Sequence, residues 1–291
     1  MKVKILLLMA LSACSLQPAA LLHAATTIDA VNKYAYGANT GWLDWTGDSA
    51  NGAVISQYFC SGYIYSANVG WINLGSGAPA NGIQYQNNSA TDYGVNLDGL
   101  GNLRGYAYGA NIGWINFEAN GTPAINLSTG NLSGYVWSAN CGWISLSNAV
   151  AYVQTDTISA GPLAPDGLPI AWLLQNFGTT NISASADPTG KGMTIGQDYV
   201  AGTDPNNVNS LLRITYESFL SGGTGAALAW ESVPTRFYHL QKTTGLSAPV
   251  WTDSGLGLVL PAAGVTTSAS FTDTNAPARF YRVQAFRPLT P

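Results

Sequence analysis

Charged side chains are scarce in this chain of 291 residues, and their scarcity limits what it can bind. Lys, Arg, Asp and Glu together make up 9% of the sequence, against about 25% in an average soluble domain. The formal net charge is −4, and the sequence has no cluster of Lys or Arg that could form the basic surface needed for nucleic-acid binding. Disorder is excluded as well, because the low charge accompanies many aromatic and β-branched residues.

Histidine and cysteine are also rare, and this excludes several kinds of metal and catalytic site. The sequence contains two His and three Cys, too few for a histidine-rich zinc site or a cysteine metal cluster. A Ser-His-Asp or Cys-His arrangement in the mature chain would have to use His239, which we interpret as a structural strand residue. No P-loop, G-x-G-x-x-G or G-x-S-x-G motif occurs in a fitting context.

The first 24 residues predict a secretory signal peptide. A basic start precedes the apolar run Ile5–Ala13, which is too short to span a bilayer, and Pro18 and Ala24 supply a break and a small residue for cleavage. Cys14 offers an alternative, because Leu11–Cys14 resembles the lipobox of bacterial lipoproteins, which would make the chain an outer-membrane lipoprotein. We favour ordinary cleavage and expect a protein that is secreted or held at the cell surface, without a transmembrane segment.

Cleavage near Ala24 leaves two cysteines, Cys60 and Cys141, which occupy different positions of the repeat described next. The two positions lie well apart in the repeat, by more than roughly 20 Å along a strand. We therefore expect two free, buried thiols rather than a disulfide.

One sequence segment is repeated four times in the first half of the chain. A fixed repeat indicates that one supersecondary unit occurs several times in the fold. Alternating residues on either side of a turn predict two strands of a hairpin, with a third short strand before each later hairpin. The spacing between the repeat tryptophans is 29, 43 and 29 residues, so 14 extra residues (43 − 29) lie between copies two and three. The copies are K-Y-A-Y-G-A-N-T-G-W-L-D-W, G-Y-I-Y-S-A-N-V-G-W-I-N-L, G-Y-A-Y-G-A-N-I-G-W-I-N-F and G-Y-V-W-S-A-N-C-G-W-I-S-L.

The turn of each hairpin is predicted at the Ala-Asn-x-Gly segment. Glycine adopts positive φ freely, and asparagine either bonds its own backbone or tolerates the left-handed region. We therefore interpret these residues as structural turn formers. They are Asn39, Gly41, Asn68, Gly70, Asn111, Gly113, Asn140 and Gly142.

Both faces of the predicted strands are apolar, which is unusual for an antiparallel sheet. One face carries aliphatic residues and the other carries three aromatic residues per repeat. We expect the aromatic face to be core, because Trp and Tyr bury large areas. The alternative is a binding or assembly surface, whose stacking platforms would be Trp42, Trp71, Trp114 and Trp143.

The second half of the chain predicts a linker with two short helices, followed by a β-domain. The helices are expected at Leu168–Phe177 and Ile195–Ala201. About seven short strands after Leu211, with Trp230 in an early one, are typical of a sandwich of immunoglobulin or fibronectin III type. The predicted fold is therefore all-β, with a barrel-, propeller- or solenoid-like repeat domain at residues 25–152, a linker at 153–210 and a sandwich at 211–291.

The chain resembles secreted proteins of planctomycetes and verrucomicrobia. Those proteins contain G-Y-A-W-x-x-N-I-G-W-I repeats, similar to residues 33–146, and a C-terminal module with D-G-L-P, A-D-P-D-G-D-G and R-F-Y-R-V motifs, similar to Asp166–Val283. The resemblance implies export and a non-catalytic accessory role. It also implies calcium loops of EF-hand or thrombospondin type 3 form, in which Asp187, Thr189 and Asp198 would be ligands.

This loop departs from the calcium pattern, so we expect no bound metal and no other cofactor. An EF-hand-like loop needs oxygen ligands at positions 1, 3, 5 and 12, and Lys191 stands at position 5, where a carboxylate is needed. The sequence also argues against an enzyme. A glycosidase needs two carboxylates in one cleft, and the candidates here are Asp44 and Glu118. In the other repeats, however, Asn or Ser stands at the position of Asp44.

We therefore expect a secreted, non-enzymatic structural or adhesive protein that associates with itself. The alternatives are a carbohydrate-binding module that uses the repeat tryptophans and, less favoured, a glycan-active enzyme. The exposure of those tryptophans to solvent distinguishes the first two.

Overall fold

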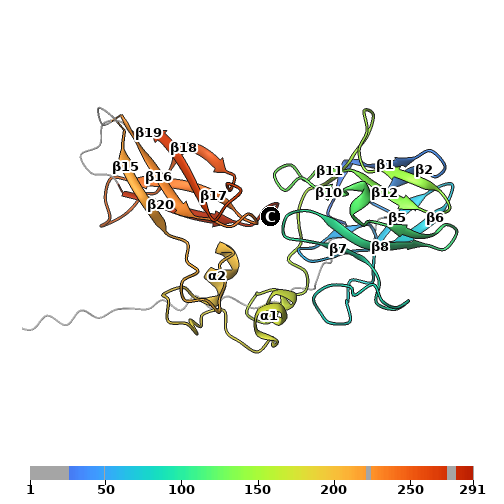
Figure 1. Ribbon diagram of the computed structural model, residues 1–291, viewed down its shortest axis with the longest axis horizontal. Helices are drawn as coiled ribbons and strands as arrows, with labels where there is room; N and C mark the ends of the chain where they lie inside the picture. The colour runs from blue at the N-terminus through green and yellow to red at the C-terminus, as the bar shows by residue number, and fades with distance from the viewer. Residues whose placement is uncertain (1–25, 49, 221–223, 274–279, 291) are drawn as a thin grey trace, which may run out of the picture.

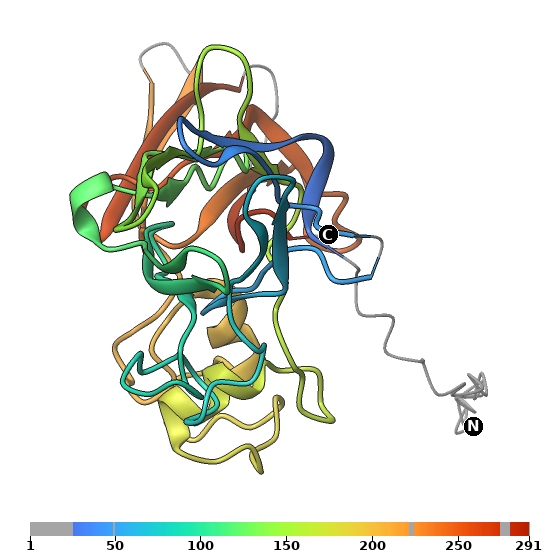
Figure 2. The same ribbon diagram turned by 90° about the vertical axis from the view of Figure 1, so that its right-hand side faces the viewer.

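The computed structural model describes residues 26–48, 50–220, 224–273 and 280–290 (Figure 1). The predicted signal peptide and Cys14 lie outside these residues. Figure 1 shows the four-repeat region on the right and the C-terminal strands on the left, and the helices α1 and α2 lie below both. Figure 2 places the same helices at the bottom of the molecule when it is seen from the barrel side.

The four repeats close into one antiparallel barrel. Each repeat contributes a hairpin, and each hairpin pairs with the next along the chain. The last strand then pairs with the first, through Ser145 opposite Tyr36 and Ile144 opposite Gly37. Of the three predicted architectures, the barrel is confirmed; its strands, in order around the wall, are β1 (Ile28–Gly37), β2 (Gly41–Asp44), β5 (Tyr63–Ser66), β6 (Gly70–Asn73), β8 (Leu103–Gly109), β9 (Gly113–Asn116), β12 (Tyr135–Ser138) and β13 (Gly142–Ser145).

Aliphatic side chains and two large aromatic rings fill the barrel interior. An eight-stranded barrel is just wide enough for side chains to fill, and the space left at its centre is only about 10 Å³, too little for a ligand. The interior therefore serves as a core; it is lined by Leu43, Trp45, Ile64, Ile72, Ile115, Phe117, Val136, Ile144 and Leu146.

The prediction that the repeat aromatic residues form the core is wrong. Trp42, Trp71, Trp114 and Trp143 are 46%, 44%, 46% and 47% exposed, because the aromatic face is the outer, convex face of the barrel. Side chains alternate across a strand, so the aliphatic positions between the aromatic ones point inward. Those smaller side chains fit the narrow interior, which has no room for the twelve aromatic rings that the repeats carry outside.

The predicted third strands exist, but they do not join the barrel wall. β3 (Val54–Ile55) pairs with β4 (Cys60–Ser61), and β10 (Ala124–Ile125) pairs with β11 (Leu132–Ser133). β7 (Val95–Leu97) pairs with the start of β8, and a one-turn 3-10 helix, η1 (Ala119–Gly121), follows β9. β14 (Val153–Thr155), just after the predicted end of the repeat domain, pairs with β1.

Both predicted helices are confirmed. α1 (Ile170–Phe177) begins after Pro169, and α2 (Ile195–Ala201) begins with a capping box between Thr194 and Gln197. Each helix ends at a glycine in the left-handed conformation, which glycine adopts at little cost. Within the described residues, no helix has the length and apolar character needed to cross a membrane.

The C-terminal strands form two three-stranded antiparallel sheets, ordered β15-β16-β19 and β18-β17-β20. Buried clusters draw on both sheets, for example Leu228 and Phe271 from one and Leu240 from the other. About seven strands were predicted, and the described part of this region contains six. The six are β15 (Ile214–Phe219), β16 (Gly225–Glu231), β17 (Phe237–Thr243), β18 (Thr252–Val259), β19 (Thr266–Thr272) and β20 (Phe280–Phe286).

Candidate functional site

The predicted hairpin turns are formed by three residues and closed by a glycine. In the first hairpin the Thr40 N–H donates to the Gly37 carbonyl, 3.2 Å away, and Gly41 follows with a φ of 69°. Gly70, Gly113 and Gly142 have φ values of 80°, 70° and 79°. This is the three-residue turn with a glycine bulge that suits a twisted hairpin, so the glycine part of the turn prediction is confirmed.

The turn asparagines have a different role from the one predicted. None of the four has a positive φ; instead, each side-chain amide donates to a backbone carbonyl of the preceding repeat around the barrel. The first asparagine closes the ring by donating to the fourth repeat. The four bonds run from Asn68 Nδ2 to Thr40 O (3.2 Å), from Asn111 to Val69 O (3.1 Å), from Asn140 to Ile112 O (3.0 Å) and from Asn39 to Cys141 O (3.1 Å).

This ring of amides holds the four turns together at one end of the barrel. The residue between the Asn and the Gly of each turn points inward and is buried, as Thr40, Val69, Ile112 and Cys141 show. The turn segment therefore links neighbouring repeats and closes the core. It is a structural element of the barrel.

The outer face of the barrel carries four sets of three aromatic side chains, which we call the aromatic sets. Within each set, the tryptophan on the second strand packs against two aromatic residues of the first strand. In the first set, for example, the ring centroids of Trp42 lie 4.9 Å from Tyr36 and 6.1 Å from Tyr34. The other sets are Tyr63, Tyr65 and Trp71; Tyr106, Tyr108 and Trp114; and Tyr135, Trp137 and Trp143.

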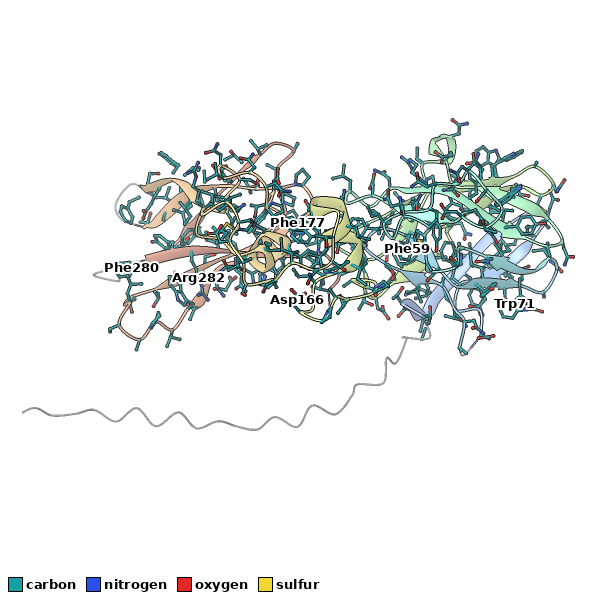
Figure 3. All side chains as sticks on the ribbon, turned by 90° about the horizontal axis from the view of Figure 1, so that it is seen from below. Phe59, Trp71, Asp166, Phe177, Phe280 and Arg282 are labelled. Atoms are coloured by element: carbon teal, nitrogen blue, oxygen red, sulfur yellow. The ribbon has the colours of Figure 1, made fainter. Side chains whose placement is uncertain are left out.

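These rings are half exposed and meet at steep angles, between 55° and 83° in the four sets. Edge-to-face contacts within a set stabilise the arrangement of its rings, so each tryptophan is held in place while part of its surface faces solvent. Figure 3 shows one of them, Trp71, at the far end of the barrel from the C-terminal sheets. Large apolar surfaces of this kind commonly mark interaction sites.

A hollow of about 470 Å³ lies beside the third aromatic set. Tyr106 and Trp114 form one side, and Asn87, Asn88, Ser89 and Tyr93 form the other. The ring of Tyr93 stands at 88° to that of Trp114, with centroids 4.9 Å apart. The hollow thus combines aromatic walls with amide and hydroxyl groups.

The polar wall of this third-set hollow comes from the insertion between repeats two and three. Its loop is braced by Asp92, whose carboxylate accepts the N–H of Ala80 (3.1 Å) and of Gln86 (3.2 Å). Asn87 adopts a φ of 54°, and its side-chain oxygen accepts the N–H of Gly94 (3.0 Å). Sequence reasoning located the 14 extra residues but assigned them no function, so it missed Asn87, Asn88, Ser89 and Tyr93.

A second hollow, of about 240 Å³, lies beside the fourth aromatic set. Trp137 and Trp143 line it together with Asn116, Glu118, Asn120 and Gly121. The carboxylate of Glu118 is held by the N–H of Gly105, 2.9 Å from Oε1. The side-chain oxygen of Asn116 in turn accepts the N–H of Glu118 at 2.5 Å.

The two hollows are neighbours on the barrel wall. Asn116 on β9 is paired with Tyr106 of the third set on one side and with Trp137 of the fourth set on the other. Trp114 on β9 and Trp143 on β13 lie two strands apart. Their backbones are about 10 Å apart across the strands and are offset by two residues along them. A single extended ligand could therefore contact both hollows.

The carboxylates considered for glycoside hydrolysis do not come together. Asp44 ends β2 and Glu118 follows β9, and these strands are separated by β5, β6 and β8, half of the way around the eight-stranded wall. Asp44 forms an ion pair with Lys33 (2.9 Å) and accepts the N–H of Thr46. Burial acts to raise the pKa of Asp44, but the hydrogen bonds from Thr46 and Lys33 outweigh it and hold that pKa below the ordinary value.

Asp44 and its counterparts in the next two repeats are structural rather than merely solvated. The side chain of Asp44 accepts the N–H of Thr46, that of Asn73 accepts the N–H of Gly75, and that of Asn116 accepts the N–H of Glu118. Each side chain thus fixes the backbone two residues beyond it, where the chain leaves the barrel wall. This explains why Asp and Asn both serve at this position.

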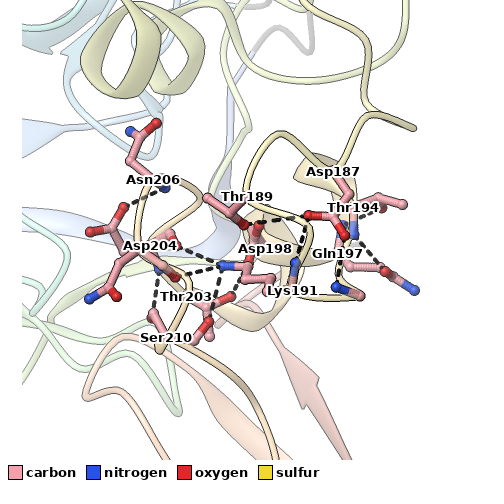
Figure 4. Close-up of polar contacts among 12 residues, drawn as sticks. Asp187, Thr189, Lys191, Thr194, Gln197, Asp198, Thr203, Asp204, Asn206 and Ser210 are labelled. Atoms are coloured by element: carbon pink, nitrogen blue, oxygen red, sulfur yellow. Dashed lines mark hydrogen bonds and ion pairs between the residues drawn. The ribbon is translucent and has the colours of Figure 1, made fainter.

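The degenerate calcium loop is closed by a lysine ammonium (Figure 4). Lys191 Nζ lies 2.8 Å from Asp198 Oδ1, and both side chains are 1% exposed. The ammonium also donates to the backbone carbonyls of Asp204 (2.7 Å), Asn207 (3.4 Å) and Ser210 (3.0 Å). A cation surrounded by four oxygens already occupies the place where a metal ion would be bound, so these residues do not fit calcium.

The other two predicted loop ligands form hydrogen bonds within the loop. The carboxylate of Asp187 accepts the N–H of Gly192 (2.7 Å) and of Lys191 (3.2 Å), and the Gly192 bond is the main reason why the pKa of Asp187 lies below its ordinary value. Thr189 donates its hydroxyl to the same carboxylate. Across the described residues, no group of three His, Cys, Asp or Glu side chains is placed to hold a metal ion.

The remaining reactive side chains have structural surroundings. His239 lies on β17 with its ring 4.7 Å from that of Phe286. Cys60 and Cys141 are buried and free, as predicted, and burial raises the pKa of the Cys60 thiol to about 12. Such a thiol is un-ionised at neutral pH and therefore unreactive.

No family model matches this sequence, and no curated protein or solved structure matches it either.

Proposed function

We propose that this chain is an extracellular carbohydrate-binding protein whose principal sites are the two hollows beside the third and fourth aromatic sets. The observation that carries the proposal is the exposure of Trp114 and Trp143, 46% and 47%, next to amide and hydroxyl groups. The apolar face of a sugar ring stacks on an exposed indole, and its hydroxyl groups bind amides and carboxylates at the edge. The third-set hollow supplies Asn87 and Asn88, and the fourth-set hollow supplies Asn116, Glu118 and Asn120.

The charge of the hollows points to the class of glycan. Neither hollow is lined by a Lys or an Arg, and the fourth-set hollow contains the carboxylate of Glu118. An acidic polysaccharide would meet this carboxylate without a compensating cation. We therefore expect neutral polysaccharides or polysaccharides of amino sugars to be the ligands. Because Trp114 and Trp143 lie two strands apart, a single chain would contact them through sugars that are separated by at least one other sugar.

We expect binding without hydrolysis, since the candidate carboxylates Asp44 and Glu118 lie on opposite sides of the barrel. Export, which the leader predicts, and the resemblance to secreted repeat proteins both fit a role outside the cell. We further infer that the two C-terminal sheets form a sandwich of immunoglobulin or fibronectin III type that acts as a spacer. The strand orders and the clusters shared between the sheets support this inference.

The test is retention of the purified protein on insoluble cellulose, chitin, xylan and polygalacturonate. We expect retention on at least one of the neutral or amino-sugar polymers and none on polygalacturonate. Trp114→Ala and Trp143→Ala should each weaken retention about fivefold, because each removes a stacking contact worth about 1 kcal/mol. The thermal melts of both variants should stay close to that of the unchanged protein, since these side chains are half exposed.

Trp42→Ala is the matched control. Trp42 has the same exposure, 46%, but no residue of the first aromatic set lines either hollow, so its loss should leave retention unchanged. Equal losses for all three variants would contradict the assignment to the two hollows. Absence of retention on every polymer would refute carbohydrate binding.

A second candidate function is self-assembly through the aromatic sets. The aromatic sets surround the barrel on all sides, and this favours self-assembly. The first and second aromatic sets belong to this surface, although neither of them lines one of the two hollows. In that case Trp42→Ala, Trp71→Ala and the other two tryptophan variants would all reduce association between copies, and none would change retention on a polymer.

A further inference from the structure

One edge of the C-terminal region is open and regular. β20 is the last strand of the sheet β18-β17-β20, and it pairs with β17 through seven consecutive residues without a register shift. The described residues contain no strand on its other side. Free edges are usually blocked by bulges, prolines or lysines, because their unpaired N–H and C=O groups attract other strands. β20 has no bulge, proline or lysine in its sequence F-Y-R-V-Q-A-F. Its one charged side chain, Arg282, stacks on Trp251 and donates to Gln241 of the neighbouring strand (2.7 Å).

The neighbouring edges are protected by comparison. β15 has a register shift between Ile214 and Tyr216. The pairing of β18 with β17 has a register shift between His239 and Gln241 of β17. β18 also contains Gly255 and Gly257, at φ values of 101° and 63°. β18 and β19, at the opposite side of the two sheets, also contact each other. Among the described strands of the two sheets, β20 combines an edge position with an unbroken ladder. α2 packs against β20 through the buried cluster that includes Ala201 and Ala285.

A hollow of about 540 Å³ lies beside this edge, and its lining mixes aromatic and aliphatic side chains with Thr215 and Glu217. Ile214 and Tyr216 of β15 line it on one side, and Phe280 and Tyr281 of β20 line it on the other. Tyr216 and Phe280 are 58% and 37% exposed. A strand added to β20 would cover these side chains, so the hollow and the edge together make an acceptor for a β-strand.

We propose that the occupant is β20 of a second copy, paired antiparallel about a twofold axis at Val283. In this register Phe280 lies opposite Phe286 of the second copy, and Arg282 lies opposite Gln284. The pattern of the strand is self-complementary, because aromatic residues meet at both ends and no like charges are directly opposite. Twofold pairing of the same surface is also the commonest way in which identical chains associate.

The chain beyond β20 leaves this edge uncovered. The side chain of Arg287 donates to Gln57 (3.3 Å), and the carbonyl of Leu289 accepts the N–H of Ile158 (2.8 Å). This segment therefore turns away from the sheet and packs against the repeat region. Figure 3 shows Phe280 and Arg282 at the opposite end of the molecule from Trp71, so pairing through β20 would leave the outer face of the barrel free.

The test measures the dimer dissociation constant of the full chain by sedimentation equilibrium. Two variants introduce charges of opposite sign at one exposed position. Gln284→Lys places a cation opposite Arg282 of the second copy, and Gln284→Glu places an anion there. Each pair occurs twice in the dimer, so we expect the dissociation constant to rise about tenfold for Gln284→Lys and to fall about tenfold for Gln284→Glu. Thermal melts at low protein concentration show that the variants fold.

Ser270 provides the matched control, since it is exposed on β19, at the opposite edge of the other sheet. Ser270→Lys and Ser270→Glu should leave the dissociation constant unchanged. A protein that is monomeric up to millimolar concentration would overturn the proposal. A dimer that responds equally to both Gln284 variants, or more strongly to the Ser270 variants, would overturn it too, since the interface would then lie elsewhere.

Discussion

The ion pair between Lys191 and Asp198 gives the sharpest prediction of stability. Its two atoms are 2.8 Å apart and both side chains are 1% exposed. Lys191→Met keeps the length and apolar stem of the side chain but removes the charge. Asp198 is then left buried without a cation, and the carbonyls of Asp204, Asn207 and Ser210 lose their donor.

Breaking a buried ion pair by removing one partner costs about 3–5 kcal/mol, so this is the loss that we expect for the Lys191→Met protein. The measurement is urea denaturation combined with amide hydrogen exchange of α2, which carries Asp198 and reports on this loop rather than on the barrel. Arg213→Met is the control. The Arg213–Glu231 pair has the same length, 2.8 Å, but its side chains are 57% and 28% exposed, so its removal should cost about 1 kcal/mol or less.

Calcium binding provides a second test of the role of Lys191. The unchanged protein should melt at the same temperature in calcium and in chelator, because the ammonium occupies the cation position. Lys191→Asp removes the ammonium and adds a carboxylate at loop position 5, the type of ligand that calcium prefers. Millimolar calcium at a micromolar site should then stabilise this variant by about 4 kcal/mol. A calcium-dependent melt of the unchanged protein, or a loss below about 1 kcal/mol for Lys191→Met, would refute the reasoning.

Two further predictions concern the barrel. Trp45→Ala should destabilise it by about 3–5 kcal/mol in urea denaturation, because Trp45 is 1% exposed inside the barrel and truncation of a buried tryptophan leaves a cavity; Trp114→Ala, on the outer face, should cost far less. The contribution of the Lys33–Asp44 pair should depend on pH in a defined way. The pKa of Asp44 is lowered, so its stabilisation is present at neutral pH and is lost as the pH falls through that lowered value, below about 4. The pKa of Lys33 is raised, mainly by its hydrogen bond to Asp44, so the pair persists in mild alkali and is lost only above the ordinary lysine value. Melts of the unchanged protein and of Asp44→Asn should therefore differ at pH 7 and converge near pH 2; a constant difference would contradict the assignment.

The hairpins and helices of this protein follow from local sequence because their signals are local. Each repeat turn requires a residue at positive φ, and a glycine stands at each of these positions, as at Gly113. The helix Ile195–Ala201 has a capping box before it and a glycine after it, and these features specify both ends. Barrel closure, in contrast, depends on the pairing of β13 with β1, about a hundred residues apart, and the sequence left three architectures open.

The choice of the inner face could not be made from periodicity, since both faces of the strands are apolar. A period of two shows which residues share a face but not which face is concave. The volume of the interior decides it: positions 35, 64, 107 and 136 carry Ala, Ile, Ala and Val, and these residues are buried, whereas the larger Tyr and Trp beside them remain outside. The sizes of the side chains could have identified the inner face from the sequence, because an eight-stranded barrel admits only a limited volume.

The third and fourth aromatic sets differ from the first through residues that the repeat does not specify. The rings of all four sets have similar geometry, so the repeat alone would predict four equal surfaces. Tyr93 and Asn87 come from the insertion before repeat three, and Glu118 and Asn120 come from the segment after β9. The fold explains the positions of the aromatic rings, but it does not require polar groups around two of them. Because polar groups add hydrogen bonds to a stacking surface and so determine which ligand it accepts, these non-repeated segments are where we place the specificity of the protein.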